Sequence, residues 1–436
     1  MKRLLILVVA LFWTLPARAE IAIQEVTSPG GITAWLVEEH ALPFMALEIR
    51  FRGGASLDAP GKRGATVLMS GLIEEGAGDM DARGFAEARE ALAASFRFDA
   101  HDDAFTISAQ FLTENRDAAV ALLRTALTQP RFDTDAIERV RGQVLSHLTS
   151  RETDPMAMVS DRFSRLAFGE HPYGSYSSGT PDSVSALTRN DIVAAFNGAI
   201  ARDRIYVGAV GDISAEALGT LLDDLFGDLP ETGAAIPDRV EFSLGDGVTV
   251  VDFDTPQSVA RFGHVGITRD DPDFFAAYVV NEILGGSGFN SRLMDEVREK
   301  RGLTYGIGTY LIPMDLSEYM IGQVSSQNDT MAEVVEVVRA EWARMAQTGV
   351  SAEELASAQT YLTGAYPLRF DGNGPIANIM VGMQMQGLPL DYIATRNDQI
   401  MAVTLDEANR VAARIYDPEA LHFVIVGRPE GVSSTE

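Results

Sequence analysis

The chain has no cysteine among its 436 residues. No disulfide can therefore support the fold, and a lipid anchor on cysteine is excluded. Stability must come from burial of a core, for which a 46% hydrophobic content is ample. The length is that of two or three domains.

Positive charge is also scarce. The 35 lysines and arginines are outnumbered by 62 acidic residues, which gives a formal net charge of −27. Nucleic acid and anionic membrane surfaces are disfavoured as partners, because both would repel such a chain.

Histidine is rare, and no two histidines stand four residues apart. A helical zinc-binding pair requires that spacing, so we expect no metal in this chain. The patterns G-x-S-x-G and G-K-[ST] are missing too, which argues against a nucleophile elbow and a P-loop. The six histidines are His40, His101, His147, His171, His264 and His422.

One apolar run stands near the amino end, over residues 4–15. It is too short to span a membrane comfortably. Positive residues precede it and Ala-Arg-Ala follows at 17–19, so we predict a signal peptide over 1–19 and a mature chain from Glu20. The expected location is the bacterial periplasm, without a stable membrane anchor. An uncleaved anchor is the alternative.

The chain repeats itself at a constant offset. Residues 184–214 align with 400–430, matching Thr188 to Thr404 and Gly211 to Gly427. Each copy has a threonine at a helix N-cap, an apolar helix, and a strand that ends in Val-Gly. Two copies of one structural unit are predicted.

The remaining pattern predicts two homologous α+β halves, 20–232 and 238–436, joined near the proline-bounded stretch 230–237. Each half is expected to be an antiparallel sheet flanked by helices, in a clam-shell-like chain. Two strands are expected in each of 32–55 and 248–267, with further strands near 104–112 and 318–325. The expected helices cover 64–75, 81–95, 114–128, 134–168, 272–284, 290–300, 328–346 and 351–369.

The segment 291–311, SRLMDEVREKRGLTYGIGTYL, sets Arg298 seven residues before Tyr305. Leu293 and Val297 share the apolar face of a predicted helix, which Gly302 ends. A strand rich in Thr, Tyr and Ile follows and places Tyr305 at its start. Taken alone, an arginine in such a charge run is usually part of a solvated helix face.

In this context the chain resembles the pitrilysin or insulinase family of zinc metallopeptidases, in its mitochondrial-processing-peptidase-like bacterial branch. The resemblance covers essentially the whole mature chain. It rests first on 291–311, and is supported by RGGASLDAPGKRGATVLMSGL at 52–72, FGEHPYGSYSSGT at 168–180 and LGGSGFNSRL at 284–293.

The chain departs from the family at its zinc motif. Active members carry H-x-x-E-H on the first core helix, where the histidines bind zinc and the glutamate is the general base. Here Val67, Ser70 and Gly71 stand in that window, around Leu68 and Met69. The third ligand would fall near 143–147, where there is no acid. The resemblance therefore implies a lost metal site.

Other polar groups have more ordinary interpretations. Glu74 and Glu75 are expected to be solvated acids at a helix end, His101-Asp102-Asp103 a loop, and 171–174 (His-Pro-Tyr-Gly) a structural turn. By resemblance, the glycine-rich loop lies beside the substrate cavity; the alternative is a helix-to-helix turn that needs positive φ. The substrate-binding residues this implies are Gly285, Gly286, Ser287 and Gly288.

In family members, zinc and base come from one half, while an Arg and a Tyr reach the substrate from another. Arg298 and Tyr305 match that second contribution. The leading hypothesis is a non-catalytic subunit, inactive alone, of a heterodimeric periplasmic zinc endopeptidase, which would donate both side chains in trans to an H-x-x-E-H partner that holds the zinc. Substrates would be peptides or unfolded segments, bound partly by strand addition. The alternative is a non-enzymatic peptide-binding or scaffold protein, like the family's core subunits in respiratory complexes.

Overall fold

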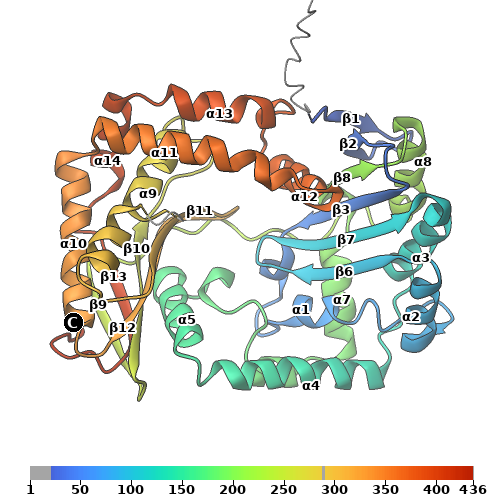
Figure 1. The fold of residues 1–436 in the computed structure, drawn as a ribbon. Helices are drawn as coiled ribbons and strands as arrows, with labels where there is room; N and C mark the ends of the chain where they lie inside the picture. Colours follow the sequence, from blue (N-terminus) through green and yellow to red (C-terminus); the bar gives the residue numbers. More distant parts are fainter. Residues whose placement is uncertain (1–20, 287–289, 436) are drawn as a thin grey trace, which may run out of the picture.

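A computed structural model describes residues 21–286 and 290–435 (Figure 1). Its first half is built on a six-stranded sheet in which β2 and β8 run parallel and all other neighbours run antiparallel. The order is β1 (Gln24–Thr27), β2 (Thr33–Glu38), β8 (Ile205–Gly211), β3 (Phe44–Arg52), β7 (Ala104–Leu112) and β6 (Ser95–Ala100).

The second half is built on a five-stranded sheet of the same design. From one edge the order is β9 (Gly247–Asp252), β13 (His422–Gly427), β10 (Gln257–Val265), β12 (Glu318–Gln327) and β11 (Ile307–Pro313). This repeats β2-β8-β3-β7-β6, with the parallel pair in the same place. The predicted α+β fold in two halves is confirmed. Each sheet is mostly antiparallel, as expected, and has one parallel pair, because the last strand of each half returns through a helix to lie beside an early strand.

The repeated segments adopt the same backbone. Thr188 and Thr404 both cap a helix, and each forms a reciprocal capping box with the acidic residue three positions later. The strands that follow end at Gly211 and Gly427, whose φ angles are 135° and 147°. A residue with a side chain would be strained at these angles, so glycine is favoured at both positions. The offset of the sequence alignment thus corresponds to a repeated structural unit.

Eight α-helices and four 3₁₀ turns belong to the described part of the first half. The helix-rich stretch predicted over 134–168 contains two helices, since Pro155 cannot continue the first one and Asp154 caps the second. The α-helices are α1 (Ala65–Ser70), α2 (Ala82–Ala91), α3 (Arg116–Thr128), α4 (Thr134–Arg151), α5 (Pro155–Phe168), α6 (Pro181–Ser185), α7 (Arg189–Ala199) and α8 (Ala215–Phe226); the 3₁₀ turns are η1 (Gly54–Leu57), η2 (Thr113–Asn115), η3 (Pro172–Gly174) and η4 (Arg202–Arg204).

In the second half, the predicted helix over 290–300 is largely a π-helix, and two helices that the sequence pattern did not reveal follow α11. They are α12 and α13, beyond the 3₁₀ turn η6. The bounds are α9 (Phe274–Gly285), η5 (Met294–Glu299, π), α10 (Met331–Thr348), α11 (Ala352–Ala365), η6 (Tyr366–Phe370), α12 (Asn373–Met385), α13 (Tyr392–Ala402) and α14 (Leu405–Ile415).

The two halves exchange helices across their contact. Helix α12 of the second half packs on β3 and β8, and α5 of the first half packs on β10 and β13 (Figure 1). A Cβ at Gly208 would lie 2.7 Å from the carbonyl oxygen of Ala377, so glycine lets α12 approach β8 closely. Apolar clusters fill both contacts, around Trp35 and Met380 in one and Phe163 and Phe168 in the other. The halves therefore interlock.

Residues 230–246, which include the predicted join, form neither helix nor strand. They are nevertheless packed: Phe242 contacts the rings of Phe163 and Phe168, and the amide of Val240 donates to Leu316 O at 2.9 Å. The domain boundaries at 232 and 238 stay a prediction.

Candidate functional site

The zinc-motif window lies on α1, which is only six residues long. Asp58 fixes its first turn by accepting hydrogen bonds from Gly64 N and from Thr66. The Ser70 hydroxyl donates back to Val67 O at 2.8 Å, and a Cβ at Gly71 would lie 3.0 Å from Val140 of α4. This window offers no nitrogen or carboxylate ligand.

The acids beyond α1 form ion pairs, so their interpretation as solvated side chains is wrong. Glu74 pairs with Arg89, and Glu75 pairs with Arg139. Burial raises the pKa of Glu74, although the positive charge of Arg89 acts to lower it. Within residues 21–286 and 290–435, no three His, Asp or Glu side chains gather as a candidate metal site.

Two segments with ordinary predicted roles prove to hold the halves together. His101-Asp102-Asp103 is the predicted loop, between β6 and β7, and Pro172–Gly174 is the predicted turn. The Tyr173 hydroxyl donates to Asp103 and accepts from Leu316 N at 3.1 Å, while Asp103 also accepts from Asp315 N at 3.1 Å. Leu316 and Asp315 belong to the β11–β12 turn of the other half. We call Asp103, Tyr173, Asp315 and Leu316 the inter-half junction; sequence reasoning missed it.

Arg298 lies in the last turn of the π-helix η5. Its Nε lies 3.4 Å from Glu299 Oε1, and its side chain is 34% exposed. The predicted apolar face is confirmed, since Leu293 and Val297 are fully buried. After the helix, Gly302 has φ +65° and donates to Arg298 O at 2.8 Å. A π-helix widens the turn locally and is often associated with functional sites.

Tyr305 is 91% exposed, which is unusual for so large an apolar ring. It precedes β11 by two residues, rather than opening that strand as predicted. Next to it, Thr304 is fixed: its hydroxyl hydrogen-bonds with Ser325 O at 2.7 Å and with the backbone of Gly306. An anchored backbone thus presents a phenol to solvent.

An ion pair between a buried arginine and a half-buried glutamate anchors the start of this helical segment and was not recognised from sequence. Arg292, 8% exposed in its side chain, donates to both oxygens of Glu354 at 2.6 and 2.9 Å and to Gly349 O. Burial alone would raise the pKa of Glu354, but these hydrogen bonds hold it at about 2. The pair ties the Arg298 segment to α11.

The described part of the glycine-rich loop is close-packed. A Cβ at Gly285 would lie 2.5 Å from Thr309 Oγ1, which donates to Asn281 at 2.9 Å. Gly286 has φ −61°, and Gly285 has no positive φ either, so the alternative of a turn needing positive φ is wrong for both. Glycine is required here for close approach. Ser287 and Gly288 lie outside the described residues.

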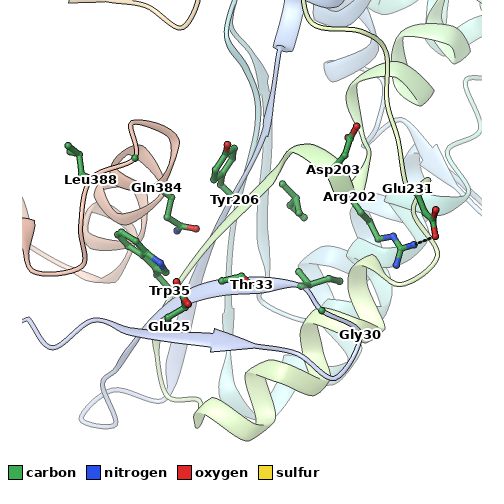
Figure 2. Close-up of a pocket in the computed structure, with 14 residues that line it drawn as sticks. Glu25, Gly30, Thr33, Trp35, Arg202, Asp203, Tyr206, Glu231, Gln384 and Leu388 are labelled. Carbon is green, nitrogen blue, oxygen red and sulfur yellow. Dashed lines mark hydrogen bonds and ion pairs between the residues drawn. The ribbon is translucent and has the colours of Figure 1, made fainter. Parts of the chain in front are cut away.

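A cavity of about 680 Å³ lies elsewhere, between the β1–β2 hairpin, η4 and the end of α12 (Figure 2). Trp35, Tyr206 and Gln384 line it, and its Arg202 is paired with Glu231. No residue of η5 or β11 reaches it.

Among the described residues, no helix is both long and apolar enough to cross a bilayer. The predicted signal segment lies outside the described residues.

Comparison with known proteins agrees with the absence of zinc ligands on α1. Residues 35–180 match the family described as Insulinase (Peptidase family M16), and residues 186–362 match Peptidase M16 inactive domain. The chain belongs to the peptidase M16 family, the pitrilysin or insulinase family, and is a non-catalytic member of it.

Individual relatives cover almost the whole chain. The Non-peptidase homolog YmxG of Helicobacter pylori is 27% identical over 98% of both chains. A crystal structure of a peptidase M16 inactive domain from Pseudomonas fluorescens superposes with a TM-score of 0.86, at 26% identity over 95% of this chain and all of that one. A chain of Complex III2 from Candida albicans shares the fold at 14% identity, with a TM-score of 0.77. The match covers 94% of this chain and 97% of that one.

Proposed function

We propose that this chain is the non-catalytic subunit of a heterodimeric periplasmic zinc metalloendopeptidase and donates Arg298 and Tyr305 in trans to a partner's zinc site. The observation that carries the proposal is the 91% exposure of Tyr305 on an anchored turn next to the Arg298 helix, in a chain whose α1 has no zinc ligands. The donors are retained, whereas the group that would generate the nucleophile is lost.

The chemistry follows from peptide hydrolysis. Attack on the scissile carbonyl creates an oxyanion, which positioned hydrogen-bond donors stabilise. A guanidinium carries several fixed N–H donors and a phenol one O–H donor. Both groups need a rigid backbone, and the Arg292–Glu354 pair before them and the Thr304 hydrogen bonds beside Tyr305 supply one. The zinc itself belongs to the partner, which bears H-x-x-E-H.

Peptides or unfolded segments are the proposed substrates. Strands β6 and β11 are edge strands of the two described sheets. An extended peptide can pair with the free backbone groups of such an edge. Since β11 begins two residues after Tyr305, a peptide added there would run next to the proposed donors.

The periplasmic location rests on the signal-peptide pattern over 1–19. The partner is proposed to be an exported homologue from the same organism. The strong negative charge disfavours nucleic acid as a competing ligand.

Reconstitution tests the proposal. This chain, the H-x-x-E-H homologue of the same organism and an equimolar mixture are each assayed on an unstructured fluorogenic peptide. We expect no turnover from this chain, little from the homologue, and full activity from the mixture together with a heterodimer peak on size-exclusion chromatography. A homologue that is fully active alone and gains nothing from this chain would refute the proposal.

The scaffold alternative has one observation in its favour, the fold shared with a chain of Complex III2 from Candida albicans. At 14% identity this likeness concerns the fold alone. Under that alternative, the chain would form a stable complex whose peptide turnover does not depend on Arg298 or Tyr305.

A further inference from the structure

A smaller cavity lies in the second half, among α9, η6, α12 and α13. Helices α9, α12 and α13 are labelled in Figure 1. Its volume is about 280 Å³. Aromatic rings form much of its wall: Phe274, Phe275, Tyr278, Tyr366 and Tyr392. We call it the aromatic pocket. Arg298 and Tyr305 do not line it.

Guanidinium groups surround the aromatic pocket, and none of the described residues that line it is acidic. Arg369, which is exposed, and Arg396, which is 5% exposed, are lining residues. Arg396 lies 4.1 Å from the ring centre of Tyr366, and Arg269 lies 4.2 Å from that of Phe274. In the part of the chain that the structure describes, none of the three arginines forms an ion pair. In a protein of net charge −27, this local concentration of positive charge favours an anion.

Arg396 has donors to spare. Only its Nη1 forms hydrogen bonds with described residues, to Leu362 O at 3.2 Å and to Asn397 Oδ1 at 3.0 Å. A guanidinium has five N–H donors, and a buried one without a carboxylate bears an uncompensated desolvation cost. An anionic ligand in the pocket would offset that cost.

Tyr366 supplies an unused donor. Its side chain is 7% exposed, and its hydroxyl is buried without a hydrogen-bond partner among the described residues. Burial, with the neighbouring Tyr392, raises the pKa of Tyr366 to about 12, so the hydroxyl keeps its proton at neutral pH. Buried hydroxyls normally have a partner. A ligand with an acceptor atom would provide one.

The size and lining of the pocket restrict the class of ligand that fits it. Cavities for drug-sized molecules span about 300–1,000 Å³, so a nucleotide would not fit. The arginines exclude a cation. A bare inorganic anion would leave the rings and the apolar side chains of Ile379 and Met383 uncovered. What remains is a single anionic group on a small apolar body.

We propose that the aromatic pocket binds a small apolar carboxylate, with the carboxylate held by Tyr366, Arg369 and Arg396 and the apolar body packed on the rings. A free aryl or alkyl acid and the carboxyl end of a peptide with an apolar last residue share this chemistry. The proposal does not depend on the in-trans peptidase role.

Calorimetry on the full chain at low salt tests it with 3-phenylpropionate and N-acetyl-Ala-Phe, each compared with its neutral amide. Both amides should bind roughly tenfold more weakly than the acids, the size of effect expected when hydrogen bonds to a charged group are lost. Tighter binding of the peptide than of the free acid would assign the site to peptide ends, and the reverse order to free acids.

Tyr366→Phe should weaken binding of the acids about tenfold without lowering the melting temperature, because the hydroxyl has no partner to lose. Tyr416→Phe is the matched control: its hydroxyl is also buried without a hydrogen-bond partner in the described part of the chain, but it lies among Trp342 and His264, away from the pocket. It should leave binding unchanged. Equal affinity for acid and amide, equal loss in both tyrosine variants, or no binding of either acid at millimolar concentration would overturn the proposal.

Discussion

The inter-half junction should make stability depend on pH through Asp315. This residue lies in the β11–β12 turn, where its Oδ2 is buried and lies 3.3 Å from Arg52 Nε. This oxygen has no hydrogen-bond partner within residues 21–286 and 290–435. Burial raises the pKa of Asp315 to about 6 despite the charge of Arg52, and Asp103 adds to the rise. The folded protein therefore holds a proton that the unfolded chain releases near 3.8.

The sign follows from this proton. Below about pH 4 the carboxyl is protonated in both states and costs nothing. Between about pH 4 and 6 the unfolded state binds fewer protons than the folded state, so stability falls as pH rises. The gap between 3.8 and about 6 corresponds to roughly 3 kcal/mol, lost in full by neutral pH.

Urea unfolding of the wild type and Asp315→Asn, at about pH 4.5 and 7.5, measures the effect. From pH 4.5 to pH 7.5, the free energy of unfolding of Asp315→Asn should rise by roughly 2–3 kcal/mol relative to that of the wild type, because the asparagine side chain cannot ionise. Asp246→Asn serves as control, since Asp246 is an exposed acid paired with Arg339. A difference between wild type and Asp315→Asn that is the same at both pH values would refute the reasoning.

Three further predictions concern metal, packing and the helix anchor. Metal analysis of the gently purified chain should find far less than one zinc per chain, because α1 supplies no ligand; about one tightly held zinc would contradict this. Gly208→Ala should lower the free energy of unfolding in urea by about 1–3 kcal/mol, because the new methyl group would push α12 away from β8. Gly142→Ala is the control: its methyl group would point into open space on α4, and it should raise the free energy of unfolding by about 1 kcal/mol. Equal effects of the two substitutions would contradict the close approach of α12 to β8. Arg292→Gln should cost about 3 kcal/mol at neutral pH. Glu354 has a pKa of about 2, below its usual 4.5, so the contribution of the pair is lost as pH falls from 4.5 toward 2 and the cost should shrink at pH 3; a cost independent of pH would argue against the pair.

Local patterns in the sequence were sufficient for much of the fold. The offset between Thr188 and Thr404 predicted the duplication, because capping and a strand-ending glycine depend on neighbours along the chain. The buried face of Leu293 and Val297 followed from helical periodicity in the same way.

Features that depend on distant partners could not be predicted. The position of α12 on the first sheet depends on the absence of a side chain at Gly208, 169 positions before Ala377. The hydrogen bond that Leu316 N donates to the Tyr173 hydroxyl joins residues 143 apart. The π-helix is a choice of hydrogen-bond register that residue identity does not encode.

The role of the two proposed donors can be separated from their structural effects. Arg298→Ala removes an aliphatic stem as well as a charge and can disturb the helix. Tyr305→Phe removes one hydroxyl from a side chain that is 91% exposed, so the fold should be unaffected. Tyr361, 45% exposed on α11, offers a matched phenol that belongs neither to the proposed pair nor to the β11 edge.

The most direct test is kcat of the reconstituted pair carrying Tyr305→Phe, with Tyr361→Phe as control and assembly checked by size-exclusion chromatography. Loss of one positioned oxyanion donor should lower kcat by about 10²–10³, or about 2.7–4 kcal/mol, while the Tyr361 variant keeps wild-type turnover. Wild-type kcat in an intact Tyr305→Phe complex would contradict the in-trans role and favour the scaffold alternative.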